Sequence, residues 1–214
     1  MKEARVPVAL EGYPFIAFAA LLTLVLAILG YVAFSLAALG LTAFVLYFFR
    51  DPERVPNEDE DALLAPADGK IILVEKVFDE RYLKEHVYKV SIFMNVFNVH
   101  VNRVPFPGLV EKVIYAPGTF HSANTERGTL CNESCAMLMT TPGGQRLAVV
   151  QIAGLIARRI VCWAGKGDKL AKGERFGLIR FGSRVDLYLP TQTHLEVGKG
   201  QKVRAGETVI GYLS

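Results

Sequence analysis

Cysteine is scarce in this chain, which narrows the kinds of site that it can build. The 214 residues include only Cys131, Cys135 and Cys162. An odd, small number of cysteines does not form a disulfide framework and suits a reducing cytosol. The Cys131-x-x-x-Cys135 spacing lacks the second ligand pair of a structural zinc site, so we expect no metal. The three thiols are expected to be ordinary apolar residues.

A large excess of charge of one sign is also missing. The formal net charge is +3, which argues against general polyanion binding, so nucleic acid is not an expected partner. Locally, residues 158–184 carry eight Lys and Arg against Asp168 and Glu174. Two interpretations of this basic stretch stay open: contact with anionic lipid headgroups beside a membrane anchor, or a solvated face of the domain.

Charge is absent altogether near the N-terminus, where no charged residue separates Glu11 from Arg50 over a run of 38. About 20 apolar residues span the hydrocarbon core as a helix, so the run predicts two membrane helices that turn at Gly30-Tyr31. It is too long for a signal peptide and lacks a small-residue cleavage pattern. The alternative is a helical hairpin buried in a soluble core. We expect residues 1–50 to form a hydrophobic membrane hairpin.

The distribution of basic residues around this run predicts its orientation. Lys2 and Arg5 precede it, Arg50 and Arg54 end it, and its middle has none. Positive charge stays preferentially on the inner side of a membrane. We therefore expect a cell-membrane protein with its C-terminal domain on the cytoplasmic side. A monotopic, re-entrant hairpin would give the same sidedness, and the sequence does not separate the two.

Long helical periodicity is missing after the hairpin. Residues 51–62 form a charged connector broken by proline, and the segments beyond it are β-rich runs bounded by Gly, Pro or Asn. The predicted strands are 70–78, 86–94, 109–115, 135–141, 146–152, 159–163, 176–181 and 185–189. The fold class is therefore mainly β, with a barrel-sandwich-like domain over residues 51–214. Its glycine-punctuated tail, 197–211, looks like half of the hammerhead hairpins of biotinyl and lipoyl domains.

The dipeptide Gly182-Ser183 carries a specific chemical possibility. A serine hydroxyl that follows glycine can attack the carbonyl of the peptide bond before it, because glycine offers no side chain to block the approach. The resulting ester can eliminate and cut the chain, and the new N-terminal dehydroalanine then hydrolyses to a pyruvoyl group. The alternative is an ordinary strand end or bulge, because Gly-Ser is a common turn dipeptide.

Several motifs accompany this dipeptide in a fixed order. They are Phe48-Phe49-Arg50-Asp51-Pro52, Pro66-Ala67-Asp68-Gly69-Lys70, Phe97-Asn98-Val99-His100-Val101-Asn102-Arg103-Val104-Pro105, Asn124-Thr125-Glu126-Arg127 and Phe181-Gly182-Ser183. With these motifs the chain resembles, over nearly its whole length, the phosphatidylserine decarboxylase family in its short, membrane-associated prokaryotic form. Long forms carry Leu-Gly-Ser-Thr at the cleavage point, where this chain has Phe-Gly-Ser-Arg.

The resemblance implies a proenzyme that cuts itself between Gly182 and Ser183. A large membrane-bound chain, 1–182, and a small chain, 183–214, would stay together as a heterodimer. Its cofactor would be a pyruvoyl group made from Ser183, with neither pyridoxal phosphate nor a metal. That carbonyl would form a Schiff base with phosphatidylserine and accept the electrons released with carbon dioxide, giving phosphatidylethanolamine for membrane phospholipid biosynthesis.

The resemblance also assigns roles to side chains. It implies an Asp-His-Ser arrangement for self-cleavage, in which His100 is the base and Asp68 fixes its tautomer. His100 is also the candidate acid that protonates the decarboxylated intermediate. The family's second histidine is replaced here by Arg103, so which group shares the proton transfers stays open.

Other residues are weaker candidates. His121 lies in a Gly-Thr-Phe-His-Ser-Ala-Asn loop that can line a pocket, and Asn124 and Glu126 match a polar family motif that can order the substrate site. His86 and His194 are expected at the surface. For His100 and Asp68 the alternatives are a satisfied core histidine and a turn before a strand.

Two alternative functions remain open. Backbone lipid chemistry leaves no mark in the headgroup motifs, so the substrate can instead be a related, archaeal-type serine lipid. The tail also allows a non-enzymatic, membrane-anchored biotinyl/lipoyl-like module, but Lys199 and Lys202 lack the flanking methionines of a modifiable lysine. A higher oligomer is neither indicated nor excluded.

Overall fold

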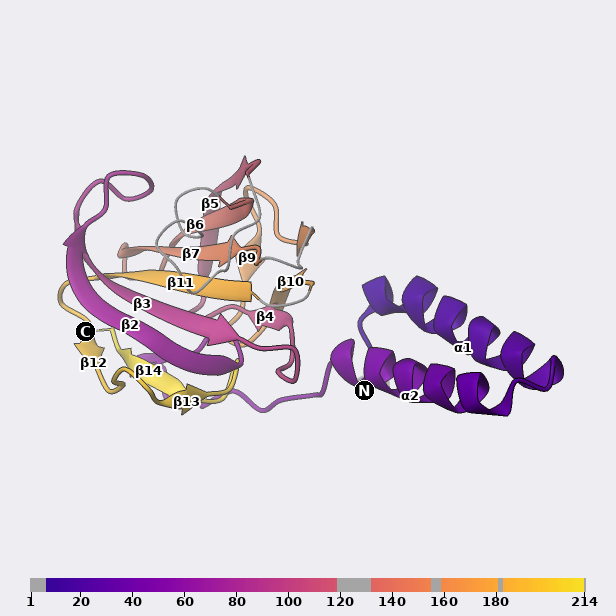
Figure 1. The fold of residues 1–214 in the computed structure, drawn as a ribbon. Coiled ribbons are helices and arrows are strands. Elements are labelled where there is room, and N and C mark those ends of the chain that lie inside the picture. The colour runs from indigo at the N-terminus through magenta and orange to yellow at the C-terminus, as the bar shows by residue number, and fades with distance from the viewer. Residues whose placement is uncertain (1–6, 119–131, 155–158, 181–182, 214) are drawn as a thin grey trace. The chain divides into compact units, whose positions relative to one another are not determined.

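The computed structural model describes residues 7–118, 132–154, 159–180 and 183–213. The chain forms two compact units, residues 1–53 and 54–214 (Figure 1). The N-terminal unit is helical and contains η1 (Leu10–Gly12), α1 (Tyr13–Ile28) and α2 (Val32–Phe48). The second unit is built from strands. These observations confirm the predicted fold class of a helical hairpin followed by a mainly β domain.

The helices pair through small side chains. Ala19 of α1 and Ala38 and Thr42 of α2 are buried, and the Thr42 hydroxyl lies 3.1 Å from that of Thr23. Gly30 connects the helices with φ +77°, a backbone conformation that glycine adopts without strain. Most large apolar side chains of the pair are exposed to solvent. The turn therefore forms where the sequence predicted it, and the hairpin presents apolar side chains outward.

One helix reaches the length and hydropathy that crossing a membrane requires. The segment Leu10–Ile28 has 19 residues, a mean hydropathy of 1.9 and only 11% of its most apolar window buried. α2 is also apolar but shorter, with 17 residues. These properties are weak support for membrane association, and they leave sidedness and depth of insertion as predictions.

The described residues of the second unit form three antiparallel sheets. An eight-stranded sheet has the order β13-β2-β3-β11-β7-β6-β5-β9, and two three-stranded sheets have the orders β1-β14-β12 and β4-β10-β8. The strands are β1 (Ala62–Leu64), β2 (Gly69–Phe78), β3 (His86–Met94), β4 (Val101–Arg103), β5 (Gly108–Ala116), β6 (Ser134–Thr140), β7 (Arg146–Ile152), β8 (Ile160–Cys162), β9 (Lys169–Leu170), β10 (Arg175–Ile179), β11 (Ser183–Pro190), β12 (His194–Leu195), β13 (Lys202–Val203) and β14 (Val209–Tyr212). Figure 1 shows the large sheet as strongly curved.

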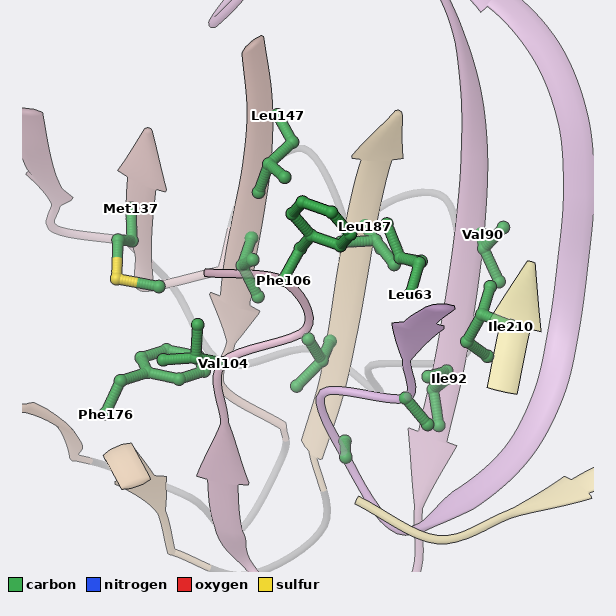
Figure 2. Close-up of a cluster of buried hydrophobic side chains, with 14 of the residues drawn as sticks. Leu63, Val90, Ile92, Val104, Phe106, Met137, Leu147, Phe176, Leu187 and Ile210 are labelled. Carbon is green, nitrogen blue, oxygen red and sulfur yellow. The ribbon is translucent and has the colours of Figure 1, made fainter. Parts of the chain in front are cut away.

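Among the described residues, the concave sheet closes around an apolar core to which all three sheets contribute, and a second, smaller cluster includes Val87, Val150 and Tyr188. Figure 2 shows Leu187 of β11 near Leu63, while Val104 and Phe176 come from the chain around β4 and β10. Strand alternation sends every second residue of β11 into this core. Ser183, Val185, Leu187 and Leu189 are all fully buried there. The core therefore fixes the position of the strand that begins at Ser183.

Candidate functional site

Ser183 is the first residue of β11, a strand flanked on both sides by partners. It pairs with Met94 of β3, and the next residue, Arg184, pairs with Phe93 of β3 and with Ile152 of β7. The Ser183 side chain is fully buried, and its hydroxyl donates to the Met94 sulfur at 3.4 Å. The strand begins two residues earlier than the predicted 185–189, so the serine itself belongs to the sheet. Gly182 lies outside the described residues.

His100 immediately precedes β4. This strand is paired with β10, which ends at Ile179, four residues before Ser183. β4 pairs with β10, and Val101 is opposite Leu178. The carbonyl oxygen of His100 accepts a hydrogen bond from the backbone N–H of Ile179 at 3.3 Å. Its side chain is fully buried. The structure thus connects His100, through the backbone, to the segment four residues before the serine.

Asp68 immediately precedes β2 and binds a different partner from the one that the resemblance implied. Its carboxylate accepts from the guanidinium of Arg54, with N–O distances of 2.9 and 3.0 Å, and from the backbone N–H of Ala205 at 2.8 Å. Lys70 of β2 pairs with Phe93, which pairs on its other side with Arg184. β3 therefore separates the start of β2 from the start of β11 by about 10 Å, two strand spacings. The role of Asp68 toward His100 stays a prediction.

Arg103, at the position of the family's second histidine, makes a structural contact. It is 5% exposed, and its Nη1 donates to the carbonyl oxygen of Gly173 at 2.9 Å. Gly206, with φ +73°, packs against its stem so closely that a Cβ there would lie 2.7 Å from the Arg103 Cδ. Arg103 thus connects β4 to two turns of the domain. His121, Asn124 and Glu126, by contrast, lie outside the described residues.

Sequence reasoning missed three polar residues near Ser183. Asn102 of β4 and Gln151 of β7 are fully buried, and the Gln151 Nε2 donates to the Asn102 Oδ1 at 2.9 Å. Arg184 was counted in the basic stretch, yet it is 4% exposed. The available signals were a glutamine in the apolar run 147–153 and the two-residue spacing of His100 and Asn102, which places both on one face of an extended chain.

Burial alters the acid–base properties of several groups around this core. It raises the pKa of the Tyr188 phenol above its usual value, and the Asp186 carboxylate raises it further. A hydrogen bond from Cys135 lowers the pKa of the Cys162 thiol, and the same contact together with burial raises the pKa of Cys135. The two thiols therefore lie close together. Across the described ranges, no group of three or more His, Cys, Asp or Glu side chains has the arrangement of a metal site.

Comparison with known proteins defines the class to which this β domain belongs. The family model described as phosphatidylserine decarboxylase matches residues 41–211. The chain thus has the β-rich domain of a decarboxylase family, and the match includes Asp68, His100 and Ser183. It also includes the glycine-punctuated tail, which the biotinyl/lipoyl-like interpretation had set apart.

Full-length relatives bear the same name. The phosphatidylserine decarboxylase proenzyme of Desulfotalea psychrophila is 56% identical over 213 residues, that of Syntrophotalea carbinolica is 52% identical over 213, and each alignment covers 100% of both chains. That of Geobacter sulfurreducens is 50% identical over 218 residues, again with full coverage of both. The chain belongs to the phosphatidylserine decarboxylase family, a family of enzymes.

Proposed function

We propose that this protein is a proenzyme that cleaves itself between Gly182 and Ser183 and then decarboxylates phosphatidylserine to phosphatidylethanolamine. The observation that carries the proposal is Ser183, a fully buried serine at the first position of a central strand. The word proenzyme in the names of the relatives fits a chain that matures by cleavage.

The self-cleavage sequence balances with water as its co-reactant. The Ser183 hydroxyl gives its proton to a base, for which His100 is the candidate, and its oxygen bonds to the carbonyl carbon of residue 182. Collapse of the tetrahedral adduct breaks the C–N bond, and the nitrogen takes up the proton, leaving an ester. A base then takes the Ser183 α-proton, the Cα–Cβ double bond forms, and the Cβ–O bond breaks to release residue 182 as a carboxylate. The dehydroalanine that remains adds water and releases ammonia.

The surroundings of Ser183 fit the small group that this step would leave. After cleavage, position 183 keeps only two carbons beyond its own carbonyl, and Met94 and Asn102 already enclose the site without solvent exposure. The pyruvoyl group supplies a ketone that condenses with a primary amine and accepts electrons on decarboxylation. The protein's part is to exclude water and to hold a proton donor, for which His100 is the candidate.

The proposed location is the cytoplasmic face of the cell membrane. A diacyl lipid does not diffuse freely in water, and the apolar helices α1 and α2 offer a way to keep the domain at the bilayer. A site at the interface takes the headgroup while the acyl chains stay in the membrane. An archaeal-type serine lipid has the same headgroup and remains the second candidate substrate.

An intact mass spectrum of the purified, denatured protein with its native C-terminus tests the proposal. We expect two chains, residues 1–182 and a small chain that starts at position 183 with a ketone in place of the amine. Borohydride should reduce that ketone and abolish carbon dioxide release from phosphatidylserine vesicles, and added pyridoxal phosphate should not restore it. A single chain near 23.6 kDa in an active preparation would refute self-processing.

A further inference from the structure

Two buried amide side chains and a thioether form a polar cluster beside the Ser183 hydroxyl. Met94 of β3, Asn102 of β4 and Gln151 of β7 are all fully buried. The Met94 sulfur lies 3.4 Å from the Ser183 Oγ and 3.8 Å from the Asn102 Nδ2. The serine hydroxyl and the asparagine amide therefore contact the same sulfur atom.

Sheet register explains why Gln151 belongs to this cluster. It pairs with Val185, and paired residues share a face of the sheet, as do residues two apart on one strand. Gln151 thus lies on the same face as Ser183. Gly177 of β10 makes room for it, because a Cβ there would lie 2.7 Å from the Gln151 Nε2.

Gln151 fixes the orientation of the Asn102 side chain. Its Nε2 donates to the Asn102 Oδ1 at 2.9 Å, which turns the Asn102 NH₂ group toward Met94. Among the described residues the Gln151 Oε1 has no hydrogen-bond partner. Gln151 thus contributes one well-formed hydrogen bond, and that bond aims the Asn102 donor.

The Asn102 NH₂ group is held in a fixed orientation but makes only a weak hydrogen bond, to the Met94 sulfur. A thioether is a poor acceptor, and 3.8 Å is long even for a contact to sulfur. A buried amide without a good partner destabilises the fold relative to a satisfied one. The bond from Gln151 accounts for the Asn102 oxygen, whereas the long contact with Met94 does not account for its NH₂ group.

We propose that Asn102, held by Gln151, donates a hydrogen bond to the oxygen that becomes negatively charged when Ser183 attacks the preceding carbonyl. This inference rests on the proposed self-cleavage. As the Ser183 oxygen bonds to the carbonyl carbon, the carbonyl electron pair moves onto its oxygen, and the Asn102 N–H stabilises that charge until the C–N bond breaks. Asn102 is then a catalytic residue and Gln151 a positioning residue. The Met94 sulfur holds the hydroxyl and the amide before reaction.

Self-cleavage, measured apart from decarboxylation, tests this role. The full-length chain is synthesised in a cell-free system with lipid nanodiscs, and the loss of precursor is followed on gels and by intact mass. Asn102→Leu should slow cleavage by about 100-fold or more, the loss typical of an oxyanion donor. Leu147→Met, a volume-conserving change at a fully buried position of β7 outside this cluster, should cleave within about threefold of wild type.

A double variant separates positioning from packing. If Gln151 acts through Asn102, Asn102→Leu/Gln151→Leu should cleave no more slowly than Asn102→Leu alone. Folding is compared in the Ser183→Ala background, where every chain stays uncut. If Asn102→Leu does not fold in this background, Asn102→Asp tests the donor role instead. A protonated aspartic acid donates a hydrogen bond, and an aspartate does not. The cleavage rate of Asn102→Asp, divided by the wild-type rate at the same pH so that protonation of His100 cancels, should then rise as the pH falls from about 8 to about 5.

The outcomes distinguish this inference from the proposed function. If wild-type chains never cut, the proposed function itself fails. If wild type cuts and a folded Asn102→Leu chain, or Asn102→Asp at every pH, cuts within about threefold of it, the inference is overturned. Hydroxylamine gives a further check: if it cuts the Asn102→Leu chain at position 183, the ester has formed and Asn102 acts after the attack, which also overturns the inference.

Discussion

Arg184 and Asp186 form a bidentate ion pair buried beside the proposed cleavage point. The Arg184 Nε lies 2.5 Å from the Asp186 Oδ1 and its Nη2 lies 3.1 Å from Oδ2, and the two side chains are 5% and 0% exposed. Nη2 also donates to the Ser91 hydroxyl of β3 at 2.7 Å. Alternation places this pair on the opposite face of β11 from the Ser183 side chain. The first strand of the proposed small chain is thus held by this ion pair on one face and by the apolar core on the other.

Removing the Asp186 charge should destabilise the domain severely. Asp186→Asn would leave Arg184 buried without a carboxylate and would also unpair Lys89, whose Nζ lies 3.7 Å from Asp186. Breaking a buried pair costs about 3–5 kcal/mol, roughly 10 °C in melting temperature for a chain of this size. Thermal melting in the Ser183→Ala background measures the loss. Glu85→Gln, which breaks an exposed ion pair with Arg146, is the control and should change the melting temperature little.

His100→Ala should block self-cleavage while the uncut chain still folds. The expected result is a single precursor band, because the Ser183 hydroxyl would lose its base. His194→Ala is the matched control, since that side chain is 78% exposed and its loss should leave processing unchanged. Normal maturation of His100→Ala would exclude His100 as the base, and His121 would be the next candidate to test.

Arg54 and Asp68 should be coupled energetically. Their side chains are 7% and 11% exposed, so each single change, Arg54→Met or Asp68→Asn, should lower the melting temperature of uncut Ser183→Ala protein. The double variant should lose less than the sum of the two, with a coupling of about 1–3 kcal/mol. Additive losses would show that the pair contributes little. The self-cleavage rates of Arg54→Met and Asp68→Asn are then compared with Ser183 intact. Slower cleavage in Asp68→Asn than in Arg54→Met would reveal a role of Asp68 besides its ion pair with Arg54.

Alkaline pH should destabilise the protein through Tyr188. Burial and Asp186 raise its pKa in the folded state, so the folded state keeps a proton that the unfolded chain loses near pH 10. The associated stability is complete below about pH 10 and is lost as the pH rises toward the folded-state pKa. Tyr188→Phe should therefore show a shallower fall in melting temperature between about pH 9 and pH 11. Parallel curves for the two proteins would contradict this assignment.

The elements of this fold could be predicted from local sequence, whereas the site mostly could not. The uncharged run up to Arg50 predicted the helical hairpin, because long apolar helices can be recognised from composition and length alone. The long strands, such as His86–Met94 and Arg146–Ile152, match their predicted bounds because alternation and breaks are local signals. Short strands such as Ala62–Leu64 and Val101–Arg103 were missed, since only pairing with distant segments makes them strands.

Contacts across sheets were beyond local reasoning for the same reason. Nothing in the segment around Asn102 specifies that Gln151, 49 residues later, lies beside it. The family motif identified Asp68 as a candidate, but not its ion pair with Arg54. That pair depends on how the connector, residues 51–62, packs against the domain. From the sequence alone Arg184 is expected at the surface. In the folded domain it is buried because Ser91 of β3 and Asp186 of β11 bind its guanidinium.

The last four strands of the chain, β11 to β14, are divided between two sheets, and this limits how long such an enzyme stays active. All four strands follow position 182. β11 pairs with β3 and β7, β13 pairs with β2, and β14 pairs with β1 and with β12. A fragment threaded through the sheets in this way cannot leave or be replaced without unfolding its host. Each molecule would therefore keep for life the one reactive group that it made, and its chemical inactivation could be repaired only by new synthesis.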